Sequence, residues 1–396
     1  MSMKQITIRL LTVLLCVACC LPLAACGRGV NPADTEQGTT ALTTGTVTEA
    51  VTLSPEEQLA ADRMEYLSTV TYRNFALTGE DSPYYVGRWF NKEIEGEDHK
   101  VTLTDGSHLY FLIENAASFD VNFTVITTGE EPYFAYSIDG GEMVRQHITE
   151  PTVTLPDTGR HTVRIVADAM TEGEGKWKQE KGFALKSIVP SEGGSIVGIR
   201  PTEKIIFFYG DSITEGIRAL NMNATSDGNS ATNAYSWQCA ESLRVTPYLV
   251  GYGASGIIMT GSFSTMQNAI DYLSDGRPAD DDITPDVIVI NHGTNDGGVN
   301  RKTFEEALTV TLNRLREKYP NIPIVYLIPF NQAHARVISS VVEGMENAYV
   351  VETRGWEITY TDGVHPDAAG AKAAGERLAE ELKKIFGEDF FLGNAE

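Results

Sequence analysis

The sequence predicts an α/β protein with two folded parts, an all-β sandwich followed by a domain built on a parallel sheet. Between about residue 70 and residue 200, short runs alternate apolar and polar side chains and are separated by turn residues. Beyond residue 203, strongly apolar strands alternate with helical stretches. A chain of 396 residues is also too long for one ordinary core. We expect the sandwich over residues 65–200 and the α/β domain over residues 203–390.

Four segments carry the prediction of a sandwich. The segments 108–115 and 121–128 read as strands, and Val121, Phe123 and Val125 would share one face of the second strand. Residues 133–144, YFAYSIDGGEMV, read as two strands joined by a DGG turn. In 161–169, HTVRIVADA, the alternation points Val163 and Ile165 away from Arg164. Several short strands at such spacing favour two packed antiparallel sheets.

The second part has four strands that are apolar along their whole length. They are IIFFY (205–209), PYLVGY (247–252), DVIVIN (286–291) and IPIVYLIP (322–329). Strands of this kind are covered on both faces, as in a parallel sheet between two layers of helices. The clearest helix spans residues 302–318, with Phe304, Leu308, Leu312 and Leu315 at helical spacing. Ligands bind such sheets at the carboxyl ends of the strands.

The amino terminus has the layout of a secretory signal peptide over residues 1–25. Lys4 and Arg9 precede an apolar run from Leu10 to Leu21, and small residues follow. A transmembrane anchor is the alternative, but the run is shorter than the roughly 20 residues that a bilayer requires. LAAC, which ends at Cys26, resembles the lipobox of bacterial lipoproteins, whose cysteine is lipidated. We therefore expect an exported lipoprotein on the bacterial cell surface, attached to the membrane only through Cys26, with a flexible linker over residues 26–60.

Charge and cysteine content narrow the possible partners. The chain has 31 basic and 54 acidic residues, a net charge of −23, so it repels phosphate backbones and we expect no nucleic-acid partner. A neutral substrate fits better. Only Cys26 and Cys239 would remain after removal of the signal peptide, so we expect no internal disulfide if Cys26 is lipidated. Cys239 itself reads as a small core residue.

Polar residues follow the ends of three predicted strands. Ser212, in GDSITEG, lies just past the first strand, where a helix should begin. A plain helix N-cap is the alternative for this serine taken alone. GYGASGI follows the second strand, and its Gly253 and Gly256 permit close backbone approach to a ligand. Asn295, in NHGTND, follows the third strand, where its amide could donate to an oxyanion, although a turn is the commoner explanation of GTND in isolation.

A fourth group lies near the carboxyl terminus. TDGVHP places Asp362 three residues before His365, directly ahead of a helix. That spacing can bring the carboxylate to one imidazole nitrogen and leave the other facing a nucleophile. A nucleophile, a base and oxyanion donors form the minimal set for acyl transfer.

These four groups, in this order, resemble the blocks of the SGNH or GDSL hydrolase superfamily. VGRW at 86–89, YFAYSIDG at 133–140 and NAYSWQCAESL at 233–243 further resemble the two-domain acetyl esterases of carbohydrate esterase family 2. The resemblance implies a three-layer α/β/α hydrolase domain preceded by a jelly-roll sandwich domain. It also implies a secreted carbohydrate O-acetyl esterase acting on acetylated oligosaccharides or polysaccharides such as xylan or glucomannan.

The same resemblance assigns roles to individual residues. Ser212 would be the nucleophile, His365 the general base and Asp362 the acid that orients His365, although some members of the closer family lack the acid and use a dyad. The backbone N–H groups of Ser212 and Gly256 and the side chain of Asn295 would form the oxyanion hole. No cofactor is implied, and the seven histidines show no metal-ligand spacing.

Several neighbouring residues have plainer interpretations. We expect Asp211 and Asp296 to bond their own loops and His292 to be structural. Trp237 reads as a buried aromatic residue, whereas Trp356, six residues before Asp362, is the better candidate to line a substrate cleft.

Three functions remain open from the sequence. The first is the sugar acetyl esterase. The second is another SGNH activity, such as a short-chain esterase, lysophospholipase or thioesterase, because one catalytic set serves many acyl groups. The third is a non-catalytic carbohydrate-binding lipoprotein, which the intact serine and histidine disfavour.

Overall fold

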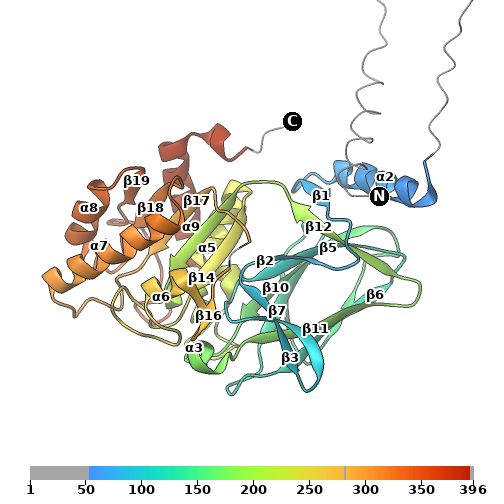
Figure 1. Cartoon of the computed structure of the whole chain (residues 1–396), viewed down its shortest axis with the longest axis horizontal. Coiled ribbons are helices and arrows are strands. Elements are labelled where there is room, and N and C mark those ends of the chain that lie inside the picture. Colours follow the sequence, from blue (N-terminus) through green and yellow to red (C-terminus); the bar gives the residue numbers. More distant parts are fainter. Residues whose placement is uncertain (1–52, 281, 393–396) are drawn as a thin grey trace, which may run out of the picture. The chain divides into compact units, whose positions relative to one another are not determined.

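The computed structural model describes residues 53–280 and 282–392 (Figure 1). The predicted signal peptide, Cys26 and the linker as far as residue 52 lie outside the described residues. No helix in the described ranges is long and apolar enough to cross a bilayer.

Helix α2 (Pro55–Thr69) is the first described element. Its start is fixed by a capping box, in which the Ser54 hydroxyl accepts from the Glu57 N–H and the Glu57 carboxylate accepts from the Ser54 N–H, and by Pro55 in the first turn. At its other end Leu67 is buried in the core. The linker prediction is therefore wrong for residues 55–60, where local capping outweighs a composition that is poor in large apolar residues.

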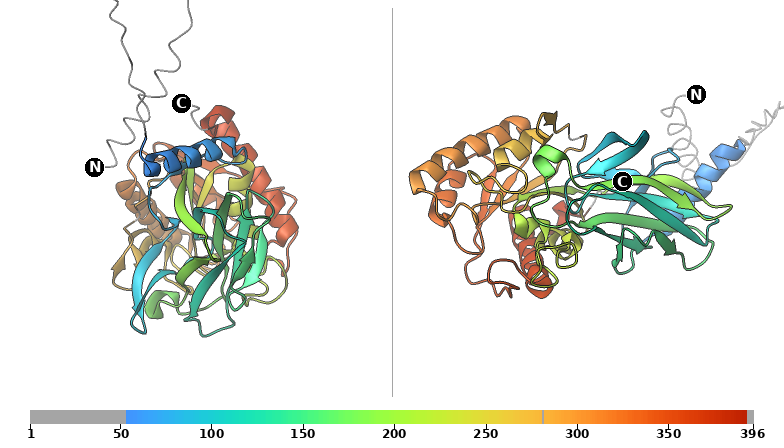
Figure 2. Two further views of the ribbon diagram at one scale, coloured as in Figure 1. Left: turned by 90° about the vertical axis from the view of Figure 1, so that its right-hand side faces the viewer. Right: turned by 90° about the horizontal axis from the view of Figure 1, so that it is seen from below.

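A sandwich of two antiparallel sheets follows (Figures 1 and 2). The first sheet has the order β1-β12-β5-β10-β7-β8, with β2 also paired to β5, and the second has the order β3-β4-β11-β6-β9. The first is formed by β1 (Phe75–Leu77), β2 (Tyr84–Val86), β5 (His108–Glu114), β7 (Tyr133–Ile138), β8 (Val144–His147), β10 (His161–Ala169) and β12 (Ser195–Pro201). The second is formed by β3 (Trp89–Ile94), β4 (Glu97–Thr102), β6 (Ser118–Val125), β9 (Thr152–Thr154) and β11 (Phe183–Pro190).

Strand β10 is buried on both faces, although its sequence alternates. Val163 and Ile165 point into the core between the two sheets, as expected. Arg164, on the opposite face, lies over the Trp237 ring at 5.0 Å and donates to Glu241 at 2.6 Å. The outer face of this sheet is therefore covered by the domain that follows.

That domain is built on a parallel sheet with the order β14-β13-β17-β18-β19. The strands are β13 (Ile205–Gly210), β14 (Thr246–Gly251), β17 (Val287–Asn291), β18 (Ile324–Leu327) and β19 (Ala348–Val351). The helices of the domain are α4 (Ser212–Glu215), α5 (Tyr235–Leu243), α6 (Met266–Asp271), α7 (Arg301–Lys318), α8 (Ala335–Glu343) and α9 (Ala368–Phe386). The short helix α3 (Lys176–Gln179) and the strand pair β15 (Tyr272–Ser274) and β16 (Arg277–Pro278) lie outside this sheet.

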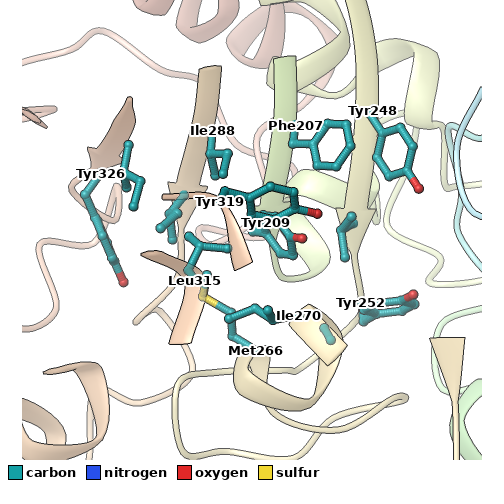
Figure 3. Close-up of a cluster of buried hydrophobic side chains, with 14 of the residues drawn as sticks. Phe207, Tyr209, Tyr248, Tyr252, Met266, Ile270, Ile288, Leu315, Tyr319 and Tyr326 are labelled. Carbon is teal, nitrogen blue, oxygen red and sulfur yellow. The ribbon is translucent and has the colours of Figure 1, made fainter. Parts of the chain in front are cut away.

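Each face of the parallel sheet buries its own apolar cluster. Phe207 and Tyr209 of β13 face helices α6, α7 and α8, and Figure 3 shows this cluster with Tyr248, Ile288 and Leu315. The alternate residues of the same strand face α5 and α9. The predicted jelly-roll sandwich followed by a three-layer α/β/α domain is thus confirmed.

Candidate active site

Ser212 is the first residue of helix α4, two residues beyond the end of β13. Asp211 caps this helix, because its Oδ1 accepts from the Ile213 N–H at 3.0 Å. Gly210 permits the sharp turn, since a Cβ at this position would collide with the Thr214 side chain. As the first helical residue, Ser212 has an N–H with no acceptor inside the helix. The strand end therefore positions the Ser212 hydroxyl and directs this N–H toward the same edge of the sheet.

His365 lies beside Ser212, although 153 residues separate them in the chain. The His365 Nε2 is 2.9 Å from the Ser212 Oγ, and the His365 Nδ1 is 2.9 Å from the Asp362 Oδ2. The turn is held by Asp362, whose Oδ1 accepts from the backbone N–H groups of Val364 and His365. The structure thus joins Ser212, His365 and Asp362, the three side chains predicted from the sequence, in one chain of hydrogen bonds.

Asp362 has a further partner that sequence reasoning missed. The Arg218 Nη1 donates to the Asp362 Oδ2 at 2.8 Å. Burial alone would raise the pKa of Asp362, but the hydrogen bonds from His365 and Val364 outweigh it and hold the pKa well below its usual value. The carboxylate is therefore charged at neutral pH. No spacing in the sequence marks Arg218, because its approach to Asp362 depends on the turn after α4.

The predicted oxyanion donors are only partly available in this arrangement. The Gly256 N–H, predicted to be an oxyanion donor, donates to the Met259 carbonyl at 2.9 Å and is not free for an oxyanion in this arrangement. The Asn295 Nδ2 donates to the Ser255 carbonyl at 2.8 Å and lies 3.3 Å from the Asp211 Oδ2. Of the three predicted donors, only the Ser212 N–H has no acceptor among the described residues.

Asp296 explains why the loop after Gly256 folds back. Its carboxylate accepts from the backbone N–H groups of Ile257, Ile258 and Met259 at 2.8–3.0 Å. A Cβ on Gly256 would lie 2.5 Å from the Asp296 Oδ2, so glycine is required for this approach. Asp296 was expected to bond its own loop, but it holds one that lies 37–39 residues away.

The remaining candidates lie away from the serine. Trp356 was expected to line the substrate cleft; instead it packs near Phe330, with ring centroids 6.3 Å apart, and lines a cavity against α9. Residues 350–358 line this cavity together with residues of α9, and no contact of the Trp356 ring with Ser212, Asp362 or His365 is seen in the described residues, so the cleft-lining role stays a prediction. Trp237 and Cys239 are buried, as expected. His292 is also buried, which lowers its pKa to about 4 and keeps the ring neutral.

Comparisons with known proteins place part of the chain beside one family. Residues 208–373 match the model of the GDSL-like lipase/acylhydrolase family. Comparison with curated sequences finds no match.

Several solved structures share the fold over most of the chain. A family two carbohydrate esterase from Clostridium thermocellum, in complex with cellohexaose, is 20% identical, with a TM-score of 0.61, covering 78% of this chain and 100% of that chain. One from Cellvibrio japonicus is 16% identical, with a TM-score of 0.63, covering 80% and 98%. An acetyl xylan esterase from Butyrivibrio proteoclasticus is 15% identical, with a TM-score of 0.60, covering 80% and 100%. At these identities the likeness is one of fold.

Proposed function

We propose that the chain is a serine carbohydrate O-acetyl esterase, since residues 208–373 match the model of the GDSL-like lipase/acylhydrolase family. The observation that carries the proposal is the chain of hydrogen bonds from the Ser212 Oγ through His365 to Asp362, with both distances 2.9 Å. Its substrate would be an acetylated oligosaccharide or polysaccharide such as xylan or glucomannan.

The geometry supports a two-step mechanism. His365 Nε2 takes the proton of Ser212 as the Oγ attacks the ester carbonyl, and Asp362 stabilises the imidazolium that forms. The sugar alcohol leaves with the proton from His365, and an acetyl-enzyme remains. Water, deprotonated by the same imidazole, then attacks the acetyl carbonyl and releases acetate and free Ser212.

The oxyanion formed in each step needs hydrogen-bond donors. The Ser212 N–H, at the start of α4, is the donor that the backbone presents directly. The Asn295 side chain and the Gly256 N–H would have to leave the Ser255 and Met259 carbonyls to join it. We propose that substrate binding drives this exchange.

The choice of a sugar ester rests on the solved structures of similar fold. Those from Clostridium thermocellum and Cellvibrio japonicus are family two carbohydrate esterases, and a further one is an acetyl xylan esterase. The low identities leave the sugar and the acylated hydroxyl as proposals. Export and attachment through Cys26 are likewise proposals, supported by Lys4, Arg9 and the LAAC segment of the sequence.

The test is acetate release from acetylated xylan and glucomannan, together with the hydrolysis of nitrophenyl acetate, butyrate and longer esters. We expect kcat/KM to fall as the acyl chain lengthens.

A second test replaces the nucleophile. Ser212→Ala should abolish turnover and leave the thermal midpoint of unfolding nearly unchanged. Ser340→Ala, which changes an exposed serine of α8, is the control and should leave turnover intact. Turnover retained by Ser212→Ala would refute the assignment of the nucleophile.

One observation favours a different acyl group. Met222, Met259 and Val364 are among the exposed large apolar side chains. The Met222 carbonyl accepts from Arg218, the Met259 N–H donates to Asp296, and Val364 directly precedes His365. Exposed apolar side chains beside a serine hydrolase site suit a longer or aromatic acyl chain. Rates that rise with acyl length would establish this second function and exclude the acetyl esterase.

A further inference from the structure

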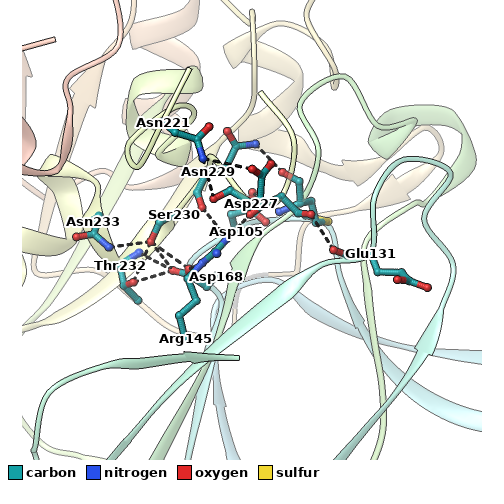
Figure 4. Close-up of polar contacts among 12 residues, drawn as sticks. Asp105, Glu131, Arg145, Asp168, Asn221, Asp227, Asn229, Ser230, Thr232 and Asn233 are labelled. Carbon is teal, nitrogen blue, oxygen red and sulfur yellow. Dashed lines mark hydrogen bonds and ion pairs between the residues drawn. The ribbon is translucent and has the colours of Figure 1, made fainter. Parts of the chain in front are cut away.

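The loop that joins β10 to α3 lies against the hydrolase domain. At the end of β10, the buried Asp168 accepts from the hydroxyls of Ser230 and Thr232 and pairs with Arg145, as Figure 4 shows. One step further on, the Asn229 Nδ2 donates to the Met170 carbonyl at 2.7 Å. These bonds fix the start of the loop to the segment that follows Ser212 and α4.

The far end of the loop is fixed by a buried ion pair. Lys176, the first residue of α3, binds Glu215, the last residue of α4, and both side chains are inaccessible to solvent. Between the two ends, the Glu172 N–H donates to the Ala224 carbonyl at 2.8 Å. The sandwich domain therefore presents Glu172 from a loop whose backbone is anchored on both sides.

The Glu172 side chain lies at the rim that carries the serine. A Cβ on Gly253 would lie 2.8 Å from the Glu172 Cγ and 3.0 Å from its Oε1. Gly253 comes two residues after β14, which pairs with β13, so it stands next to the strand end from which Ser212 projects. Glycine at 253 thus makes room for a carboxylate supplied by the other domain.

Glu172 is also half-buried, and its carboxylate makes no hydrogen bond or ion pair to any residue in the described part of the chain. The ionisable groups around it are Glu215, His365, Arg218 and Lys176. Burial and then Glu215 raise its pKa, whereas the other three groups lower it. Lys176 and Arg218 are already bound to Glu215 and Asp362, so the Glu172 oxygens remain available to a ligand.

We propose that Glu172 is a specificity-determining residue whose carboxylate accepts a hydrogen bond from a free hydroxyl of the sugar that carries the ester. This inference rests on the proposed esterase function and names one substrate contact of the same site. A carboxylate acceptor favours a donor with a hydroxyl hydrogen, and such charge-assisted bonds are the stronger ones. An ester whose alcohol part lacks other hydroxyls cannot make this contact.

The test compares two substrates in the full chain, acetylated xylo-oligosaccharides and 4-nitrophenyl acetate. For Glu172→Gln, which keeps the side-chain shape, we expect the ratio of kcat/KM for the saccharide to kcat/KM for the nitrophenyl ester to fall by about tenfold or more, mostly through a higher KM. Glu192→Gln, an exposed residue of the sandwich, is the control and should keep the wild-type ratio.

Three other results would contradict the proposed role of Glu172. Equal losses on both substrates, or a shift in the pH dependence of nitrophenyl acetate hydrolysis, would mean that Glu172 acts on His365 and would overturn the proposal. An unchanged ratio would overturn it and leave the esterase function standing. A wild-type chain that releases acetate from no saccharide would refute both.

Discussion

Asp362 accepts hydrogen bonds from two side chains, the imidazole of His365 and the guanidinium of Arg218. The second bond gives the carboxylate a fixed position that does not depend on the protonation of His365. At the scale of single residues, a full triad therefore fits this site better than the dyad that the resemblance also allows.

Replacement of this acid tests the triad. Asp362→Asn removes the charge that stabilises the imidazolium, so we expect kcat on nitrophenyl acetate to fall by roughly 10²- to 10⁴-fold. Steady-state kinetics at saturating substrate measures the loss. Asp367→Asn, at the cap of α9, is the matched control and should retain activity. A loss of less than about threefold for Asp362→Asn would indicate a Ser–His dyad.

Asp211 gives a prediction about stability and pH. Complete burial raises its pKa to about 7, from an ordinary value near 4. The folded state therefore holds this proton more tightly than the unfolded state, and stability is lost as pH rises from about 4 through 7. The loss from this group is at most about 4 kcal/mol.

The measurement is urea unfolding of wild type and Asp211→Asn at several pH values between 4 and 8. The variant cannot titrate at this position, so its free energy of unfolding should fall less steeply with pH. Asp81→Asn, in an exposed loop, should keep the wild-type slope. Identical slopes for all three proteins would show that Asp211 does not titrate in this range.

The reactive side chains could be predicted from the sequence, but the hydrogen bonds and packing of the residues around them could not. Ser212, Asp362 and His365 could be found because each lies in a short segment with a recognisable place at a strand end or helix start. The Met259 carbonyl that occupies the Gly256 N–H could not be foreseen, since it depends on Asp296 folding a distant loop back. The packing of Trp356 near Phe330 and α9 could not be foreseen either, because nearness in sequence to Asp362 says little about side-chain direction in an irregular segment.

At the scale of elements, α3 and α4 are joined by a buried ion pair. Burial alone would lower the pKa of Lys176, but the charges of Glu215 and Asp105 outweigh it and raise it. Asp105 lies at the same place, with its Oδ2 4.0 Å from the Lys176 Nζ. The Lys176 ammonium thus lies beside two buried carboxylates, those of Glu215 and Asp105. Its removal would leave their negative charge without a neighbouring positive charge.

We therefore expect Lys176→Met to lower the free energy of unfolding by about 3–5 kcal/mol. The double variant Lys176→Met, Glu215→Gln should recover part of this loss, because it removes a buried charge together with its partner. Chemical denaturation measures both. Lys372→Met, on the exposed face of α9, is the control, and a double variant no more stable than the single one would contradict the argument.

Helices and strands whose apolar residues recur at regular spacing could be predicted from the sequence. The burial of elements that distant segments cover could not. The helix expected over residues 302–318 is α7, Arg301–Lys318, because an apolar stripe on a polar helix leaves few alternatives. Strand β10 alternates in sequence yet is buried on both faces. Arg164 reads as a solvent-facing residue until Trp237 and Glu241 of another domain cover it.

At the scale of the whole described unit, the two domains share their apolar cores. One cluster joins Phe75 and Tyr110 of the sandwich to Phe207 and Tyr248 of the parallel sheet, and another joins Val166 to Leu249. Neither domain can separate without exposing this surface to water. We expect the chain to unfold in one cooperative transition, with coincident calorimetric and circular dichroism midpoints.

Asp168 tests that coupling, because it connects β10 to the hydrolase domain through Ser230, Thr232 and Arg145. Asp168→Asn leaves the Arg145 charge without its buried partner, so we expect a loss of about 2–4 kcal/mol in the free energy of unfolding. The transition should move to lower temperature as one event, since both domains lose the same contact. If scanning calorimetry instead resolved two transitions in the variant, with the hydrolase domain unaffected, the shared core would not couple the domains.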